Sequence, residues 1–163
     1  MNTHTWMEWG RLLLHDAWWS AIAALGFAVL FSVPPRLLWG CMLGGAVGHM
    51  VRTFCMQMGL SIEAGTLLGA MAIGLLGEWL ARRTHTPALV FTVSAAIPMV
   101  PGAFAFGTML NLIDFSNTPD AGAGQVLLWQ AAYDAIKTAL VLAAIAFGIT
   151  WPALVLRRPR PVV

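Results

Sequence analysis

Ionised side chains stand out in this sequence because they interrupt otherwise apolar stretches. His49 and Arg52 fall in one such stretch, and Asp134 and Lys137 fall in another. An arginine fork suits a carboxylate ligand through paired hydrogen bonds, and histidine and aspartate relay protons in many transport proteins. A third apolar stretch carries two prolines and a glycine within Pro98–Gly102. Proline breaks a helix, so this segment is predicted to leave backbone groups without helical partners.

The elements that hold these residues are predicted to be membrane helices in a single domain. The chain has 163 residues, of which 59% are hydrophobic and 10% charged, whereas soluble domains carry about 25% charged residues. The net charge of +2, without a basic run among aromatics, excludes nucleic acid as a partner. Cys41 and Cys55 fall on one predicted helix, roughly 21 Å apart, too far for a disulfide. Neither has a metal ligand at usable spacing, so no metal or cofactor is expected.

Five stretches reach or approach the roughly 20 apolar residues that a spanning helix needs. The predicted fold is therefore all-α and integral to the membrane, with the fourth span broken at the Pro-x-x-Pro-Gly motif. The ranges are 17–33, 37–58, 64–81, 88–113 and 126–151, with a loop over Asp114–Gly124 and a basic tail over 152–163. The second range is the weakest because it contains His49 and Arg52, and four spans remain the alternative. The first stretch is too long for a signal core and is expected to stay in the mature protein.

Charge asymmetry favours five spans and gives an orientation. With five spans, one side of the membrane holds Arg36, Arg82, Arg83, Arg157, Arg158 and Arg160, whereas the other holds only Arg11. Loops rich in arginine stay in the cytoplasm. The sequence therefore predicts an outer N-terminus and a cytoplasmic C-terminus.

The ionised residues and the proline motif are predicted to lie in one layer of the bilayer. At about 1.5 Å per residue from the outer ends, Arg52 lies roughly 9 Å deep and Asp134 roughly 12 Å deep, and His49, Lys137 and the motif follow at roughly 14 to 22 Å. Backbone groups freed there must line a cavity or be buried in protein. Simpler interpretations stay open: a proline kink that only shapes packing, an Asp134–Lys137 pair on one helix, or an Arg52–Asp134 structural pair. Asn111 is a further candidate polar liner.

Small residues at four-residue spacing predict close helix packing, as is usual between membrane helices. The predicted packing positions are Gly40, Gly44, Gly48, Gly65 and Gly69. These faces would direct His49 and Arg52 toward protein and away from lipid. They would serve self-association equally well, so a homo-oligomer is also open.

Two motifs resemble the threonine/serine exporter superfamily, in particular the small subunit of its split type. They are Ala96–Gly102, which reads AIPMVPG, and Gly44–Arg52, which reads GGAVGHMVR. The resemblance implies a bacterial inner-membrane exporter that works with a larger membrane subunit of the same family. It implies threonine and serine as substrates, or C4-dicarboxylates such as succinate.

Carried over residue by residue, the resemblance places Pro98, Pro101 and Gly102 in the proline motif and His49 and Arg52 in the histidine–arginine motif. Asp134 and Lys137 match no family feature, so their role rests on depth alone. Family members often have tyrosine just after the proline motif, where this chain has Phe104 and Phe106. A hydroxyl contact at that place is therefore not expected.

The leading hypothesis is half of a secondary exporter for small carboxylate-bearing metabolites. In it Arg52, His49, Asn111 and the proline motif bind substrate, and Asp134, His49 or Lys137 couples ions. The alternative is a non-transporting subunit that stabilises a transporter complex. An intramembrane enzyme is not favoured, because Ser94 has no evident base beside it. The chain also lacks a nucleotide-binding GxxxxGK[ST] loop, so it is not expected to hydrolyse ATP.

Overall fold

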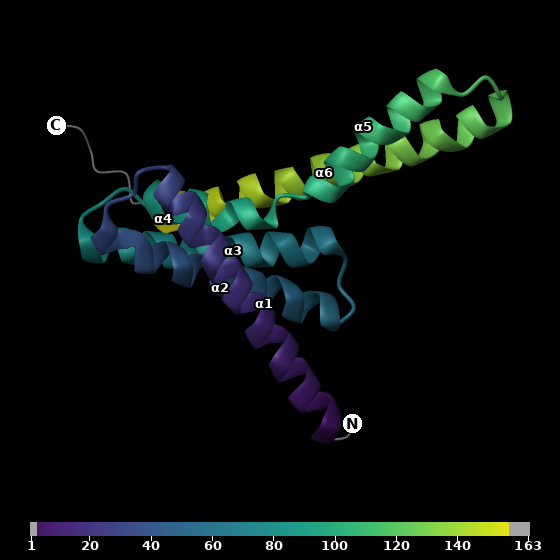
Figure 1. The fold of residues 1–163 in the computed structure, drawn as a ribbon. Coiled ribbons are helices and arrows are strands. Elements are labelled where there is room, and N and C mark those ends of the chain that lie inside the picture. The colour runs from purple at the N-terminus through teal and green to yellow at the C-terminus, as the bar shows by residue number, and fades with distance from the viewer. Residues whose placement is uncertain (1–2, 157–163) are drawn as a thin grey trace. The chain divides into compact units, whose positions relative to one another are not determined.

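The computed structural model describes residues 3–156, and within this range the chain is helical, with turns between the helices and no strands. Figure 1 shows the elements in chain order. They are α1 (Thr3–Leu30), η1 (Pro35–Leu37), α2 (Leu38–Gln57), α3 (Ile62–Thr84), α4 (Leu89–Ala96), η2 (Ile97–Met99), α5 (Gly102–Asn117) and α6 (Ala121–Leu156). The all-α expectation is confirmed for this part of the chain.

The chain divides into two compact units. Unit 1 runs to Met99 and resumes at Ala144, and unit 2 is Val100–Ala143. Unit 1 therefore holds α1 to α4, η2 and the last part of α6, and unit 2 holds α5 and the first part of α6.

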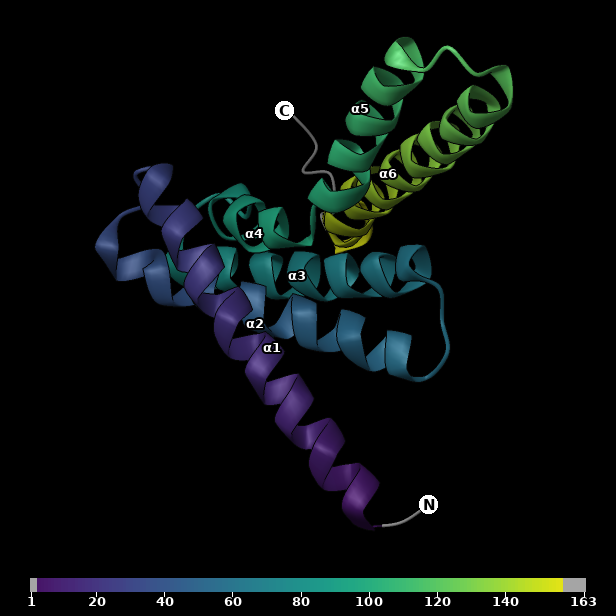
Figure 2. The same cartoon turned by 45° about the vertical axis from the view of Figure 1, so that its right-hand side comes forward.

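Glycines let the helices of unit 1 approach closely, and α2 and α3 lie side by side in both views (Figures 1 and 2). A Cβ atom added to Gly69 would lie 2.6 Å from the carbonyl oxygen of Gly48. On the other side of α2, a Cβ atom at Gly45 would lie 2.6 Å from Cβ of Ala24 on α1. The remaining predicted packing positions also meet neighbours: Gly40 meets Phe91, Gly44 meets Ala95, Gly48 meets Ile73 and Gly65 meets the Arg52 carbonyl.

Three predicted helix boundaries were wrong. The helix predicted from Ala17 begins at Thr3, and the predicted loop Asp114–Gly124 shrinks to the three residues between α5 and α6. Side-chain hydrogen bonds explain the short loop. The Asn117 amide donates to the Ile113 carbonyl and supports the end of α5, while the Asp120 carboxylate accepts from two backbone amides at the start of α6. Such turn-forming residues cap helices as readily as they form loops.

The third boundary concerns Pro152, which was predicted to end the last helix but lies inside α6. A proline in a helix loses one backbone hydrogen bond and its ring needs space. Gly74 of α3 supplies that space, because a Cβ atom there would lie 2.9 Å from Cγ of Pro152. The predicted basic tail thus begins within a helix, and residues 157–163 lie outside the described part of the chain.

Helix length and composition test the predicted spans. Among the described residues, three helical segments are long and apolar enough to cross a membrane: Glu8–Leu30, Ile62–Thr84 and Ala121–Val155. The number becomes four if Leu89–Met99 and Gly102–Asn117 together count as one broken span. The helix α2 is not among them, and it is the segment that contains His49 and Arg52. Five spans therefore remain a prediction.

Candidate functional site

The proline motif interrupts the helical backbone. The α-helix α4 ends at Ala96, the 3₁₀ turn η2 covers Ile97–Met99, and α5 begins at Gly102. Pro101, just before α5, has φ −82° and ψ 64°, which is not a helical conformation. Pro98 and Pro101 have no backbone N–H, and the helical backbone is interrupted between Met99 and Gly102, so carbonyl groups in this stretch lack their usual helical donors. These carbonyls are the first component of a candidate site.

Arg52 supplies a donor to one of these carbonyls. Its Nη1 atom donates to the Met99 carbonyl oxygen at 3.2 Å. The glycine face of α3 makes room for this contact: a Cβ atom at Gly69 would lie 2.8 Å from Cε of Met99 and 3.3 Å from Cβ of Arg52. Arg52 extends from α2 and packs against α3. Its guanidinium therefore lies at the end of η2, where the helical backbone is interrupted.

His49 and Thr53 meet a carboxylate from α1. The His49 Nδ1 atom lies 3.6 Å from Oδ2 of Asp16, and the Thr53 hydroxyl donates to the same oxygen. The His49 side chain is 14% exposed and that of Asp16 is 33% exposed. We refer to the side chains of Asp16, His49, Arg52 and Thr53 together with the Met99 carbonyl as the unit 1 polar cluster.

Asp16 is the member of this cluster that sequence reasoning missed. It lies one residue before the predicted first span, which begins at Ala17, and so fell outside the predicted membrane segments. A usable signal was present: Asp16, Ser20 and Ala24 are spaced by four residues and so share a helix face. Gly45 of α2 packs against Ser20 and Ala24 on that face, which turns Asp16 toward α2.

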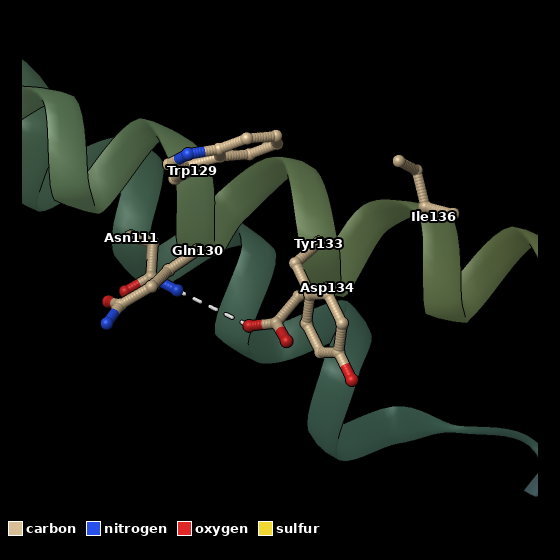
Figure 3. Close-up of a pocket in the computed structure, with 6 residues that line it drawn as sticks. All are labelled: Asn111, Trp129, Gln130, Tyr133, Asp134 and Ile136. Atoms are coloured by element: carbon tan, nitrogen blue, oxygen red, sulfur yellow. Dashed lines mark hydrogen bonds between the residues drawn. The ribbon is translucent and has the colours of Figure 1, made fainter.

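The remaining predicted site residues lie in unit 2. The Asn111 amide of α5 donates to Oδ2 of Asp134 on α6 at 3.3 Å, across the helix pair shown in Figure 3. Gly107 leaves space for this carboxylate, since a Cβ atom there would lie 2.6 Å from the same oxygen. The Lys137 ammonium lies 5.7 Å from the centre of the Tyr133 ring.

These two helices of unit 2 form an open groove of about 600 Å³. Its walls combine aromatic, amide and carboxylate groups: Asn111, Trp129, Gln130, Tyr133, Asp134 and Ile136. Amide and carboxylate groups beside aromatic rings can bind a polar molecule while shielding it from lipid.

The structure therefore sorts the predicted site residues into two sets. His49, Arg52 and Pro98 lie in unit 1, whereas unit 2 contains Pro101, Gly102, Asn111, Asp134 and Lys137. That both sets serve one binding site remains a prediction. Within residues 3–156, no three His, Cys, Asp or Glu side chains are grouped so that they could hold a metal ion.

The apolar helices and the ionised groups held between them define the class as a helical membrane protein. A family profile described as "Threonine/Serine exporter, ThrE" matches residues 16–155. The chain therefore belongs to the threonine/serine exporter family, which confirms the resemblance seen in its motifs. This is a family of transporters and not of enzymes.

A relative from Haemophilus influenzae, described as an uncharacterized protein, is 36% identical over 151 residues. The match covers 93% of this chain and 50% of the relative, so the chain spans about half the length of that protein. No solved structure matches the chain.

Proposed function

We propose that this chain is one subunit of a secondary exporter for small carboxylate-bearing metabolites. Threonine and serine are the first candidates because of the family, and C4-dicarboxylates such as succinate are the second. The chain spans half of a relative, which supports a need for a second, larger membrane subunit of the same family. The proposed location is the bacterial inner membrane, with five spans, an outer N-terminus and a cytoplasmic C-terminus.

The observation that carries this proposal is the hydrogen bond from Arg52 to the Met99 carbonyl. It fixes a guanidinium beside an interrupted helix, which is how many transporters build substrate sites at mid-membrane. A guanidinium has several N–H donors in a planar fork, so one bond to a carbonyl leaves others for a substrate carboxylate. We assign substrate binding to Arg52 and His49, with backbone contacts from Pro98.

The residues of unit 2 are assigned complementary roles. Backbone amides at Gly102, where α5 begins after Pro101, would attract a carboxylate as helix N-termini do. Asn111 would hydrogen-bond the substrate, and Asp134 and Lys137 would take part in ion coupling with His49. The interrupted pair α4–α5 would count as a single broken span in this arrangement.

Replacement of Arg52 tests the proposal. Inverted membrane vesicles from cells that produce the chain with its membrane partner would be assayed for uptake of labelled threonine, serine and succinate. We expect Arg52→Gln to reduce uptake about 10- to 100-fold, because a charged hydrogen bond is worth about 1.5–3 kcal/mol. Arg52→Lys should restore only part of it, since lysine lacks the planar fork. Arg11→Gln is the control, and unaltered uptake in Arg52→Gln would remove Arg52 from the site.

A second candidate function is assembly without transport, and the glycine contacts between α2 and α3 favour it. In that case the chain would only stabilise a partner, and Arg52→Gln would be tolerated. A bulky change such as Gly48→Leu would then abolish recovery of the complex. Uptake by Arg52→Gln therefore separates the two candidates: a loss of uptake with an intact complex supports the exporter, and normal uptake supports assembly without transport.

A further inference from the structure

We propose that His49 and Asp16 form the binding site for a coupling proton, with the Thr53 hydroxyl orienting the carboxylate. The inference deepens the proposed function, since a bound proton would drive the export assigned above. It adds Asp16 and Thr53, which no motif in the sequence indicates. The site joins α1 to α2 within unit 1.

The geometry selects one nitrogen of His49 as the proton acceptor. Asp16 Oδ2 lies 3.6 Å from Nδ1 and also accepts the Thr53 hydroxyl proton. A carboxylate near one ring nitrogen favours the tautomer that carries its hydrogen there. The lone pair of neutral His49 is then on Nε2, and this is the atom that a proton would join.

Nε2 is also the atom whose surroundings are incomplete. It is buried and has no hydrogen-bond partner among the described residues. A buried polar atom without a hydrogen-bond partner lowers the stability of a fold, so the unpartnered Nε2 atom needs an explanation. A proton on Nε2 would turn the acceptor into a donor, and the Pro98 carbonyl is among the groups that act on the imidazole.

The charges around His49 are compatible with both binding and release of a proton. The charged groups that act on the imidazole are Asp16 from α1 and Arg52 from its own helix, while η2 contributes the Pro98 carbonyl. Without the extra proton, the carboxylate and the guanidinium balance each other. A proton taken from water on one side of the membrane makes His49 an imidazolium facing Asp16, and its release to the other side restores the neutral imidazole.

Proton binding at His49 would thereby change the contacts made by the interrupted helix at η2. An imidazolium has N–H groups on both nitrogens, so it can face Asp16 on α1 with one and the Pro98 carbonyl with the other. Arg52, one helical turn further along α2, already holds the neighbouring Met99 carbonyl. A ligand shifts a conformational equilibrium only through contacts that differ between states, and these contacts change with the proton.

Nitrogen NMR of the purified full chain, labelled with ¹⁵N-histidine, tests the site without any transport. The chain has four histidines, and the His49 signals are those lost in His49→Gln. We expect neutral His49 to carry its hydrogen on Nδ1 and to take up a second proton on Nε2 when the pH is lowered. Asp16→Asn should displace its midpoint by about one pH unit or more. The control is His15→Gln, which should leave the His49 midpoint unchanged, because the His15 side chain accepts a hydrogen bond from Trp19 and is not part of the site.

The proposal is overturned if the His49 signals show no protonation while the chain stays folded, or if the neutral ring carries its hydrogen on Nε2. It is overturned equally if Asp16→Asn moves the midpoint no further than His15→Gln does. Thr53→Val provides a second variant should Asp16→Asn fail to fold, and a smaller displacement is expected from it.

Transport then separates this inference from the proposed function. In inverted vesicles, Asp16→Asn should lose gradient-driven accumulation by at least about tenfold yet retain exchange of labelled for unlabelled substrate. If Asp16→Asn accumulates substrate like the wild type, the proton site is wrong and the exporter stands. If the wild type neither accumulates nor exchanges any tested substrate, the exporter proposal fails while the NMR titration still decides the proton site.

Discussion

Unit 1 and unit 2 hold their polar residues in different ways. In unit 1, helices meet through glycines backbone to backbone, and the polar cluster packs against Gly69 of α3 and the buried Met99 side chain. In unit 2, α5 has no buried residue, and large apolar side chains such as Phe106 and Trp129 are exposed.

The comparison teaches that the same device, a glycine opposite a polar group, serves two purposes. Gly69 of unit 1 faces a backbone oxygen that cannot move independently, so it fixes the distance between α2 and α3. Gly107 of unit 2 faces the tip of the Asp134 side chain, which can rotate. We infer that unit 1 supplies fixed geometry and that unit 2 supplies an adjustable polar surface.

Replacing Gly69 by alanine should have the largest effect on stability. The added Cβ atom would lie 2.6 Å from the Gly48 carbonyl oxygen, and overpacking of this kind costs about 1–3 kcal/mol. We expect a loss near the upper end of that range, measured by unfolding the purified chain in mixed detergent micelles. Gly26→Ala is the control, because nothing lies within 4 Å of a Cβ atom there. Equal stability of the two variants would contradict the fixed contact between α2 and α3.

The difference between the units also marks what could be predicted from the sequence. The glycine spacing in α2 and α3 predicted faces that the structure does pack closely, because a missing side chain has the same consequence wherever two helices meet. The contact between His49 and Asp16 was not predicted: the four-residue spacing of Asp16, Ser20 and Ala24 marks a shared face of α1, but the spacing does not show that this face meets α2. Hydropathy placed α1 among the spans but says nothing about the rotation of the helix.

The span count shows a second limit. Charge asymmetry favoured five spans, yet α2 falls outside the segments that length and apolar composition select. The reason is physical: α2 contains Gly40, Gly44, Gly45 and Gly48 along with His49 and Arg52, and these residues serve helix contacts at the expense of hydropathy. The proline motif was easier to locate, since the backbone chemistry of proline acts locally.

Replacing Gly107 by alanine should have a much smaller effect, although its Cβ atom would meet Asp134 at the same 2.6 Å distance. The carboxylate can turn away, so the cost is mainly the bond to Asn111, and interhelical hydrogen bonds in membranes average about 0.6 kcal/mol. The better helix propensity of alanine offsets about as much. We expect stability within about 1 kcal/mol of the wild type in the same unfolding assay. A loss as large as that of Gly69→Ala would show that unit 2 is as rigid as unit 1.

The smallest effect is expected at Thr92 of α4, and its sign is opposite. The Thr92 hydroxyl is buried and has no hydrogen-bond partner among the described residues, although it lines a cavity of about 160 Å³ with Glu78 and Thr150. Valine has nearly the same shape without the hydroxyl, so Thr92→Val should raise the stability of unit 1 by up to about 1 kcal/mol.

Thr150→Val is the comparison for this change, because the Thr150 hydroxyl already donates to the Ala146 carbonyl within α6. Loss of the Thr150 hydroxyl should lower the stability of the protein slightly or leave it unchanged in the same micelle assay. If Thr92→Val instead destabilises the protein by more than Thr150→Val does, the Thr92 hydroxyl must have a partner in the cavity. A water molecule near Glu78 would be such a partner, and unit 1 would then contain a hydrated polar site in addition to the unit 1 polar cluster.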